Sequence, residues 1–153
     1  MKISREFIEK GLLKEEKIDF SQIGKVLAKS RRTIKSASLL LGDGDAEGSY
    51  ELAYESMLLA GRALVFSFNL RPRAAGSHKI VIDFVREMLD DSTKDALIFK
   101  FDKMRKNRHY LIYGSGLAIS ETEAKNAISS AKEFIAQIEK IIQKKNPQKK
   151  LEI

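Results

Sequence analysis

Cysteine and tryptophan are absent from this chain of 153 residues, and proline and histidine occur only twice each. Without cysteine, the chain has no disulfide bond, no thiolate metal site and no cysteine nucleophile. A zinc site would have to combine His78 and His109 with carboxylates, and no stretch places such ligands at a suitable spacing. We therefore expect a protein that binds no metal and carries no other cofactor.

Long apolar runs are also missing. No segment approaches the roughly 20 apolar residues that a transmembrane helix needs, and the N-terminus carries too many charges for a signal peptide. The sequence therefore predicts a cytoplasmic protein with no membrane partner.

Charge is unbalanced toward the positive side. Lys and Arg number 28 against 21 Asp and Glu, which gives a net charge of +7 and an isoelectric point near 9.5. Such a balance favours acidic partners, with nucleic acid first among them, although charged surfaces also keep proteins soluble. The length suits one domain with its own hydrophobic core.

Apolar residues recur at three- and four-residue spacing along most of the chain, which is the pattern of amphipathic helices. No set of segments shows the alternation that strands require. The pattern predicts an all-α fold, an up-and-down bundle of four to five helices. We divide the chain into an N-terminal helical arm (1–18), the helical bundle (19–145) and a basic, flexible tail (146–153).

The bundle has recognisable helix signals. Asp19 or Ser21 can cap its first helix, and Ser120 with Glu123 forms a capping box for its last. The segment 49–69 is apolar around most of its circumference, so we expect it to be the central helix. Arg62, inside this segment, is expected to be ion-paired or to extend toward solvent.

A dense basic stretch ends the helix predicted over residues 93–112. This helix has an apolar stripe, and basic residues follow the stripe almost without a break; the stripe consists of Ala96, Leu97, Phe101 and Met104. Residues three and four apart share a helix face, so one continuous patch is expected from Arg105, Arg108, His109 and Tyr113. Guanidinium groups at this density suit phosphate, whose oxygens match their fork of donors. The alternative is a solvated basic face, because cations are favoured near any helix C-terminus.

Several segments resemble the HEPN family. The family's second core helix is similar to Ala53-Tyr54, Met57, Ala60 and Arg62-Ala63-Leu64, and its following loop and helix start resemble Arg71-Pro72 through Gly76, His78 and Ile80-Val81-Ile82. The family's signature is Arg, a polar residue, three further positions and His. Arg108 to Tyr113 fits this signature except at its end, where Tyr113 stands in place of His. The resemblance covers about residues 21–144.

This resemblance implies a homodimer that cleaves RNA without metal, at a cleft between two protomers. A ribose 2′-OH attacks the adjacent phosphate, which leaves a 2′,3′-cyclic phosphate. By carry-over, the catalytic candidates are Arg108, Tyr113 and His109, and the RNA or phosphate contacts are Arg105, Lys106, Asn107 and Lys103. Family members of this size are often toxins paired with a small nucleotidyltransferase antitoxin.

Tyr113 departs from the family in a way that affects chemistry. A free tyrosine has a pKa of about 10, against about 6.5 for histidine, so it is a poor base at neutral pH. Tyr113 could instead be an aromatic residue of the dimer interface. His109 could replace the missing imidazole, but the polar second position of the signature is the favoured interpretation. For His78 we favour a structural loop or cap role.

The leading hypothesis is a homodimeric HEPN-type RNA-binding module that cleaves RNA weakly or not at all. The alternative is a non-catalytic homodimer whose basic cleft binds a nucleotide or an acidic partner. A plain structural bundle stays open as a third interpretation, because the basic face also has a simple explanation.

Overall fold

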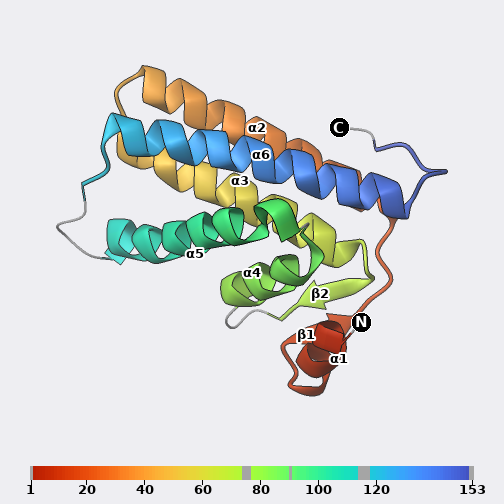
Figure 1. Cartoon of the computed structure of the whole chain (residues 1–153). Helices are drawn as coiled ribbons and strands as arrows, with labels where there is room; N and C mark the ends of the chain where they lie inside the picture. The colour runs from red at the N-terminus through yellow and green to blue at the C-terminus, as the bar shows by residue number, and fades with distance from the viewer. Residues whose placement is uncertain (1, 74–76, 90, 114–117, 152–153) are drawn as a thin grey trace.

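The structure, a computed structural model, describes residues 2–73, 77–89, 91–113 and 118–151. In these residues the chain forms six helices and one pair of short strands (Figure 1). The helices are α1 (Lys2–Glu9), α2 (Phe20–Gly42), α3 (Ala46–Phe66), α4 (Ser77–Met88), α5 (Asp91–Tyr113) and α6 (Glu121–Lys145), and the strands are β1 (Leu13–Glu15) and β2 (Leu70–Pro72). The predicted all-α class is confirmed, with α2 to α6 forming the helical bundle.

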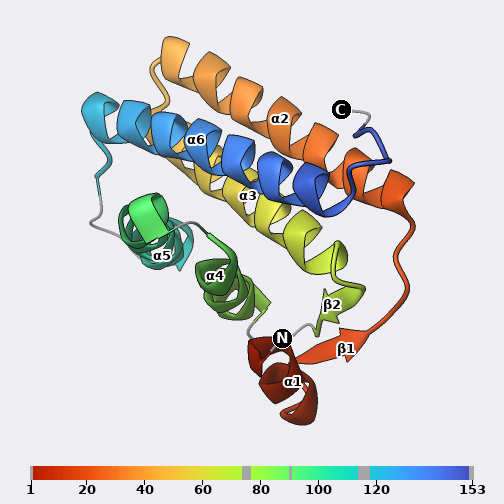
Figure 2. The same cartoon turned by 45° about the vertical axis from the view of Figure 1, so that its right-hand side comes forward.

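Three long helices, α2, α3 and α6, run side by side and form one layer of the bundle (Figures 1 and 2). As predicted, α3 lies at the centre and is buried along most of its length. It begins at Ala46, three residues earlier than the sequence indicates, because the Asp45 side chain accepts a hydrogen bond from the Gly48 amide at 2.8 Å. The predicted capping box of Ser120 and Glu123 is present at the start of α6.

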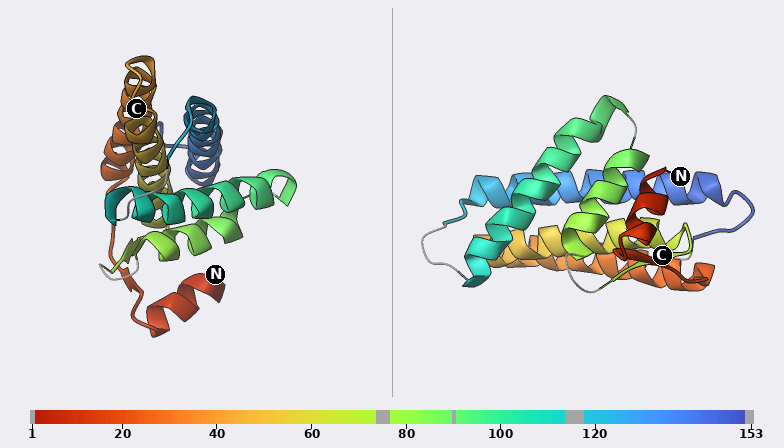
Figure 3. Two further views of the ribbon diagram at one scale, coloured as in Figure 1. Left: turned by 90° about the vertical axis from the view of Figure 1, so that its left-hand side faces the viewer. Right: turned by 90° about the horizontal axis from the view of Figure 1, so that it is seen from below.

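Helices α4 and α5 form a second layer that crosses the first (Figure 3). Helix α4 approaches α3 closely at Gly61, where a Cβ atom would lie 2.5 Å from Cγ1 of Val81. Any side chain at this position would push α4 away from α3. This contact explains why a glycine, which weakens a helix by about 1 kcal/mol relative to alanine, stands inside the central helix.

An aromatic chain anchors α5 on the first layer. The Phe101 ring of α5 lies 5.7 Å from the Tyr54 ring of α3 and 5.0 Å from the Phe134 ring of α6. All three side chains are fully buried. The α5 stripe is correct at Leu97, Phe101 and Met104 but wrong at Ala96, which is exposed; the buried neighbour is Ile98. A crossing helix turns only a narrow strip toward the core, so the residues at the edge of that strip depend on the crossing angle.

The N-terminal segment is not one helix up to Lys17, as its periodicity suggests. Helix α1 ends at Glu9, and Gly11 takes a left-handed conformation (φ 72°) that turns the chain. Strand β1 then pairs antiparallel with β2, with Leu13 opposite Pro72. Strands of three residues are too short to show alternation in the sequence, and so this pair was not predicted.

The described part of the C-terminal tail folds back toward the bundle. The Gln143 side chain donates to the Asn146 carbonyl at 3.0 Å, and the Leu151 amide donates to Oε1 of Gln143 at 3.3 Å. Leu151 packs against the core cluster. Across the residues that the structure describes, none of the helices combines the length and the apolar character needed to cross a membrane.

Candidate phosphate-binding site

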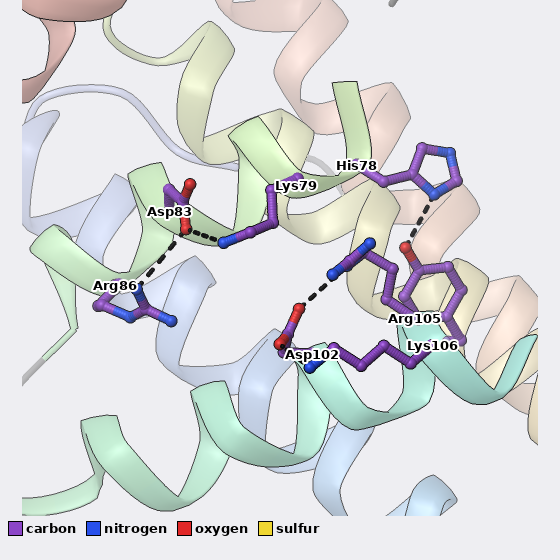
Figure 4. A network of polar contacts seen from close by, with 8 residues as sticks. His78, Lys79, Asp83, Arg86, Asp102, Arg105 and Lys106 are labelled. Carbon is purple, nitrogen blue, oxygen red and sulfur yellow. Dashed lines mark hydrogen bonds and ion pairs between the residues drawn. The ribbon is translucent and has the colours of Figure 1, made fainter. Parts of the chain in front are cut away.

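Two of the predicted phosphate contacts share one aspartate on α5. Nε of Arg105 lies 3.0 Å from Oδ1 of Asp102, and Nζ of Lys106 lies 3.3 Å from Oδ2 (Figure 4). Burial raises the pKa of Asp102, but the hydrogen bonds and charges of Arg105 and Lys106 outweigh it and leave this pKa below its ordinary value. The carboxylate therefore stays ionised at neutral pH and neutralises part of the basic stretch.

Helix α4 repeats this arrangement. Asp83 lies 2.9 Å from Nζ of Lys79 and 3.6 Å from a guanidinium nitrogen of Arg86 (Figure 4). Each aspartate thus holds two cations of its own helix at i,i+3 or i,i+4 spacing. These four cations already have an anionic partner.

The other two predicted phosphate contacts, Asn107 and Lys103, both lie near Tyr50 of α3. The Asn107 amide donates to the Tyr50 hydroxyl at 3.0 Å, which ties α5 to α3. Lys103 is exposed and lines a groove of about 240 Å³ between α5 and α6, where Tyr50 and Phe99 are among its neighbours. Lys103 also lines a second hollow of about 520 Å³ together with Asp102 and Lys106, so it lies beside the pair of cations that Asp102 holds.

Arg108 has different surroundings from the cations that Asp83 and Asp102 hold. Its Cζ atom lies 5.8 Å from the centroid of the Tyr54 ring, and its side chain is half-buried. Among the described residues, no carboxylate pairs with it. Burial raises the pKa of Tyr54, so its phenol stays neutral beside the guanidinium. Arg108 is thus held against an aromatic ring while its charge remains without an anionic partner in the described part of the chain.

His78, in the first turn of α4, meets the same tyrosine. Its Nδ1 atom lies 2.8 Å from the Tyr54 hydroxyl, and the two ring centroids are 5.8 Å apart (Figure 4). Burial lowers the pKa of His78, and the charges of Arg62 and Arg108 lower it further. The imidazole is therefore neutral at neutral pH. The sequence favours a structural loop or cap role for His78, and it gives no sign that His78 and Arg108 meet at the same tyrosine.

Arg62 of α3 completes the group. It is half-buried, its charge acts on both Tyr54 and His78, and no ion pair joins it to another described residue. The ion pair expected for Arg62 is thus not found within the described ranges. We call Tyr54, His78 and Arg108, together with Arg62 whose charge acts on the first two, the Tyr54 cluster. Glu55 is the acidic group that acts on it, and Arg105 adds a further positive charge.

The remaining catalytic candidates lie at the end of α5. His109 is exposed, and its ring centroid lies 6.1 Å from that of Tyr110. Tyr113 is the last residue of α5, and its side chain lies outside the described part of the structure. Whether Tyr113 faces Arg108 therefore remains a prediction. Within the described ranges, no three His, Asp or Glu side chains gather as a metal site would require.

The chain matches one model in the comparison with protein families. The model of the HEPN domain matches residues 23–141, which is more than half of the chain and includes every residue of the Tyr54 cluster. A search of curated proteins found no match. HEPN domains are a family of RNA-binding and nuclease-like modules. On the extent of this match, the chain belongs to the HEPN family.

Proposed function

We propose that this protein is an RNA-binding HEPN module that holds the RNA backbone at Arg108. The observation that carries the proposal is the half-buried Arg108 guanidinium, which lies over the Tyr54 ring and has no carboxylate partner among the described residues. A partly desolvated charge is stabilised when an anion approaches it. A planar guanidinium matches the oxygens of a phosphodiester, and arginine is common at such contacts.

The module acts as a homodimer in this proposal. Two large apolar side chains that follow Arg108 on α5 are exposed, Tyr110 at 59% and Ile112 at 43%. Exposed aromatic and aliphatic residues beside a functional residue are typical of a protein interface. A two-fold axis near Arg108 and Tyr113 would bring both copies of the signature to one RNA strand. Light scattering at micromolar concentration should show a dimer.

RNA cleavage is the second part of the proposal, and it is expected to be weak. The 2′-oxygen would form a bond to phosphorus while the bond from phosphorus to the 5′-oxygen breaks. Arg108 would stabilise the additional negative charge on the phosphorane. The 2′-OH proton needs an acceptor, and tyrosine at position 113 is a poor one because of its high pKa. A toxin-like role with a small nucleotidyltransferase as partner rests on the family resemblance alone.

The test is binding of a fluorescent single-stranded RNA at about 50 and 200 mM salt, since phosphate contacts weaken steeply over this range. Arg108→Ala should weaken binding far more than Lys149→Ala, which removes a positive charge from the tail. Equal effects of both substitutions would contradict the proposal. Incubation with total RNA and EDTA, followed by analysis of the product ends, tests cleavage separately.

A non-catalytic nucleotide-binding homodimer is the second candidate. The groove of about 240 Å³ between α5 and α6 supports it, because exposed Phe99 offers a face for a base and Lys100 and Lys103 line the same groove. Titration with a mononucleotide distinguishes the two candidates. Binding lost in Phe99→Ala and unchanged in Arg108→Ala would favour this second function.

A further inference from the structure

We propose that Arg62, His78 and Arg108 form one phosphate-binding site within a single protomer, in which the His78 imidazole takes up a proton as the phosphate binds. This inference deepens the proposed function, on which it rests for the identity of the ligand as an RNA phosphodiester. It adds two residues, from α3 and α4, that lie outside the signature on α5.

The geometry centres on Tyr54. The Arg108 guanidinium lies over its ring at 5.8 Å, and His78 binds its hydroxyl through Nδ1 at 2.8 Å. Tyr54 is fully buried, so its position is fixed by the core. Because Nδ1 is held, the ring presents its other nitrogen, Nε2, on the side away from the Tyr54 hydroxyl (Figure 4). No hydrogen bond joins Nε2 to another described residue, and so it can donate to a phosphate oxygen.

The charges around the cluster explain the coupling to a proton. Arg62 from α3 and Arg105 and Arg108 from α5 disfavour a positive charge on His78, and Glu55 from α3 is the group that favours it. In the free protein, protonation of His78 would thus place one more positive charge beside three guanidinium groups. A bound phosphodiester supplies the missing negative charge and reverses this preference. Binding and protonation of His78 are therefore expected to favour each other.

Other cations of this face are less suited to the role. Lys79, Arg86, Arg105 and Lys106 are all held by Asp83 or Asp102. Arg62 and Arg108 have no such partner among the described residues, and both are half-buried. A site of two guanidinium groups and an imidazole also gives donors from three separate helices, which fixes the orientation of a tetrahedral anion.

The experiment uses NMR, because His78 and His109 are the two histidines of the chain and can be assigned with a His109→Gln variant. The probe is a short single-stranded RNA with 2′-O-methyl groups, which cannot be cleaved and whose phosphodiesters do not titrate near neutral pH. We expect saturation with this RNA to raise the pKa of His78 by about one unit, which by linkage equals about tenfold tighter binding when His78 is protonated. The imidazole resonances of His109 should change much less when the RNA binds.

Two variants test whether RNA binding depends on the Tyr54 cluster or on the cations around it. Arg62→Gln should weaken RNA binding by about fivefold or more and should reduce the response of His78, since 1 kcal/mol corresponds to about that factor. The control is Lys79→Gln, which removes an equal charge from the turn next to His78 but from a lysine already paired with Asp83. It should change the affinity less than twofold, a difference well below 1 kcal/mol. If Arg62→Gln does not fold by circular dichroism, Arg62→Lys replaces it and should retain the response in part.

The outcomes distinguish this inference from the proposed function. RNA binding that depends on Arg108 but leaves the pKa of His78 unchanged would overturn the inference and keep the function. A response of His109 in place of His78 would also overturn it. If inorganic phosphate raises the pKa of His78 while the RNA does not bind, the site is correct and its assignment to RNA is wrong.

Discussion

The cations held by Asp102 and the Arg108 guanidinium belong to the same helix, α5, yet their surroundings differ. Arg105 and Lys106 share one carboxylate at 3.0 and 3.3 Å. Arg108 is half-buried against an aromatic ring, and within the described residues it has no carboxylate partner. A ligand must compete with Asp102 for the first pair, whereas it can approach Arg108 without breaking an ion pair. The difference shows that the density of basic residues in a sequence does not measure the charge available for binding.

The two groups also differ in how their charge responds to pH. Near Arg105 and Lys106 the titrating group is Asp102, whose pKa is raised by burial but lowered overall by the hydrogen bonds and charges of these two cations, so the carboxylate stays ionised near neutral pH. The Tyr54 cluster contains a neutral imidazole beside guanidinium groups, which can change its charge when an anion arrives. Binding at the Asp102 pair should therefore be insensitive to pH near neutrality, and binding at the cluster should be sensitive.

The largest expected effect comes from Tyr113→His, which would restore an imidazole to the signature. If the phosphate is held at Arg108, cleavage of RNA in EDTA should rise by about 10²–10⁴-fold, the usual contribution of one general acid or base. The products should end in 2′,3′-cyclic phosphate. Adding Arg108→Ala should abolish the gain. Strong cleavage by the unaltered protein that His109→Ala removes would instead assign the catalytic role to His109.

The next largest effect is the loss of RNA affinity in Arg108→Ala, which we compare with the loss in Lys106→Ala. Loss of the unpaired guanidinium should weaken binding of single-stranded RNA by about tenfold, which corresponds to about 1.4 kcal/mol. Loss of Lys106 should cost less than threefold, because its charge is already offset by Asp102. Fluorescence anisotropy at one fixed salt concentration measures both. A larger loss for Lys106→Ala would mean that the paired cations are the main RNA contact.

Removing Asp102 should make Arg105 and Lys106 more similar to Arg108 in their contribution to RNA binding. In Asp102→Asn, Arg105 and Lys106 lose their anionic partner, so RNA should bind about two- to fivefold tighter, as expected for exposed ion pairs worth about 0–1 kcal/mol. The affinity should also fall more steeply with salt, since more cations contact phosphate. Asp83→Asn on α4 is the matched comparison. Unchanged affinity in Asp102→Asn would place Arg105 and Lys106 outside the RNA path.

The smallest effect concerns stability and pH. The pKa of His78 is lower in the folded protein than its ordinary value of 6.5, because of burial and the nearby arginines. At a pH between these two pKa values, the unfolded chain binds more protons than the folded protein. The part of the free energy of unfolding that depends on neutral His78 should therefore be fully present above about pH 6.5 and should fall as the pH drops below it. Urea unfolding at pH 7.5 and 5.5 measures this loss. His78→Gln should reduce it, whereas His109→Gln should not.

Much of the fold could be predicted from the sequence because its signals are local. Helices α2 to α6 follow the apolar periodicity, and the capping box at Ser120 lies within four residues of the chain. The signature arginine, Arg108, could also be identified from neighbouring residues together with the family resemblance. Periodicity and caps act through residues that are close in sequence, so no knowledge of the packing was needed.

The tertiary structure decided which side chains meet. The β1–β2 pair joins Leu13 to Pro72, and the cluster brings His78 of α4 to the hydroxyl of Tyr54, whose ring Arg108 of α5 lies over. It also decided that Arg105 pairs with Asp102. Each of these contacts except the last joins distant parts of the chain, and the last depends on the direction of one side chain. Such contacts follow from how the crossing layers pack, and for that reason His78 could not be linked to Arg108 before the fold was known.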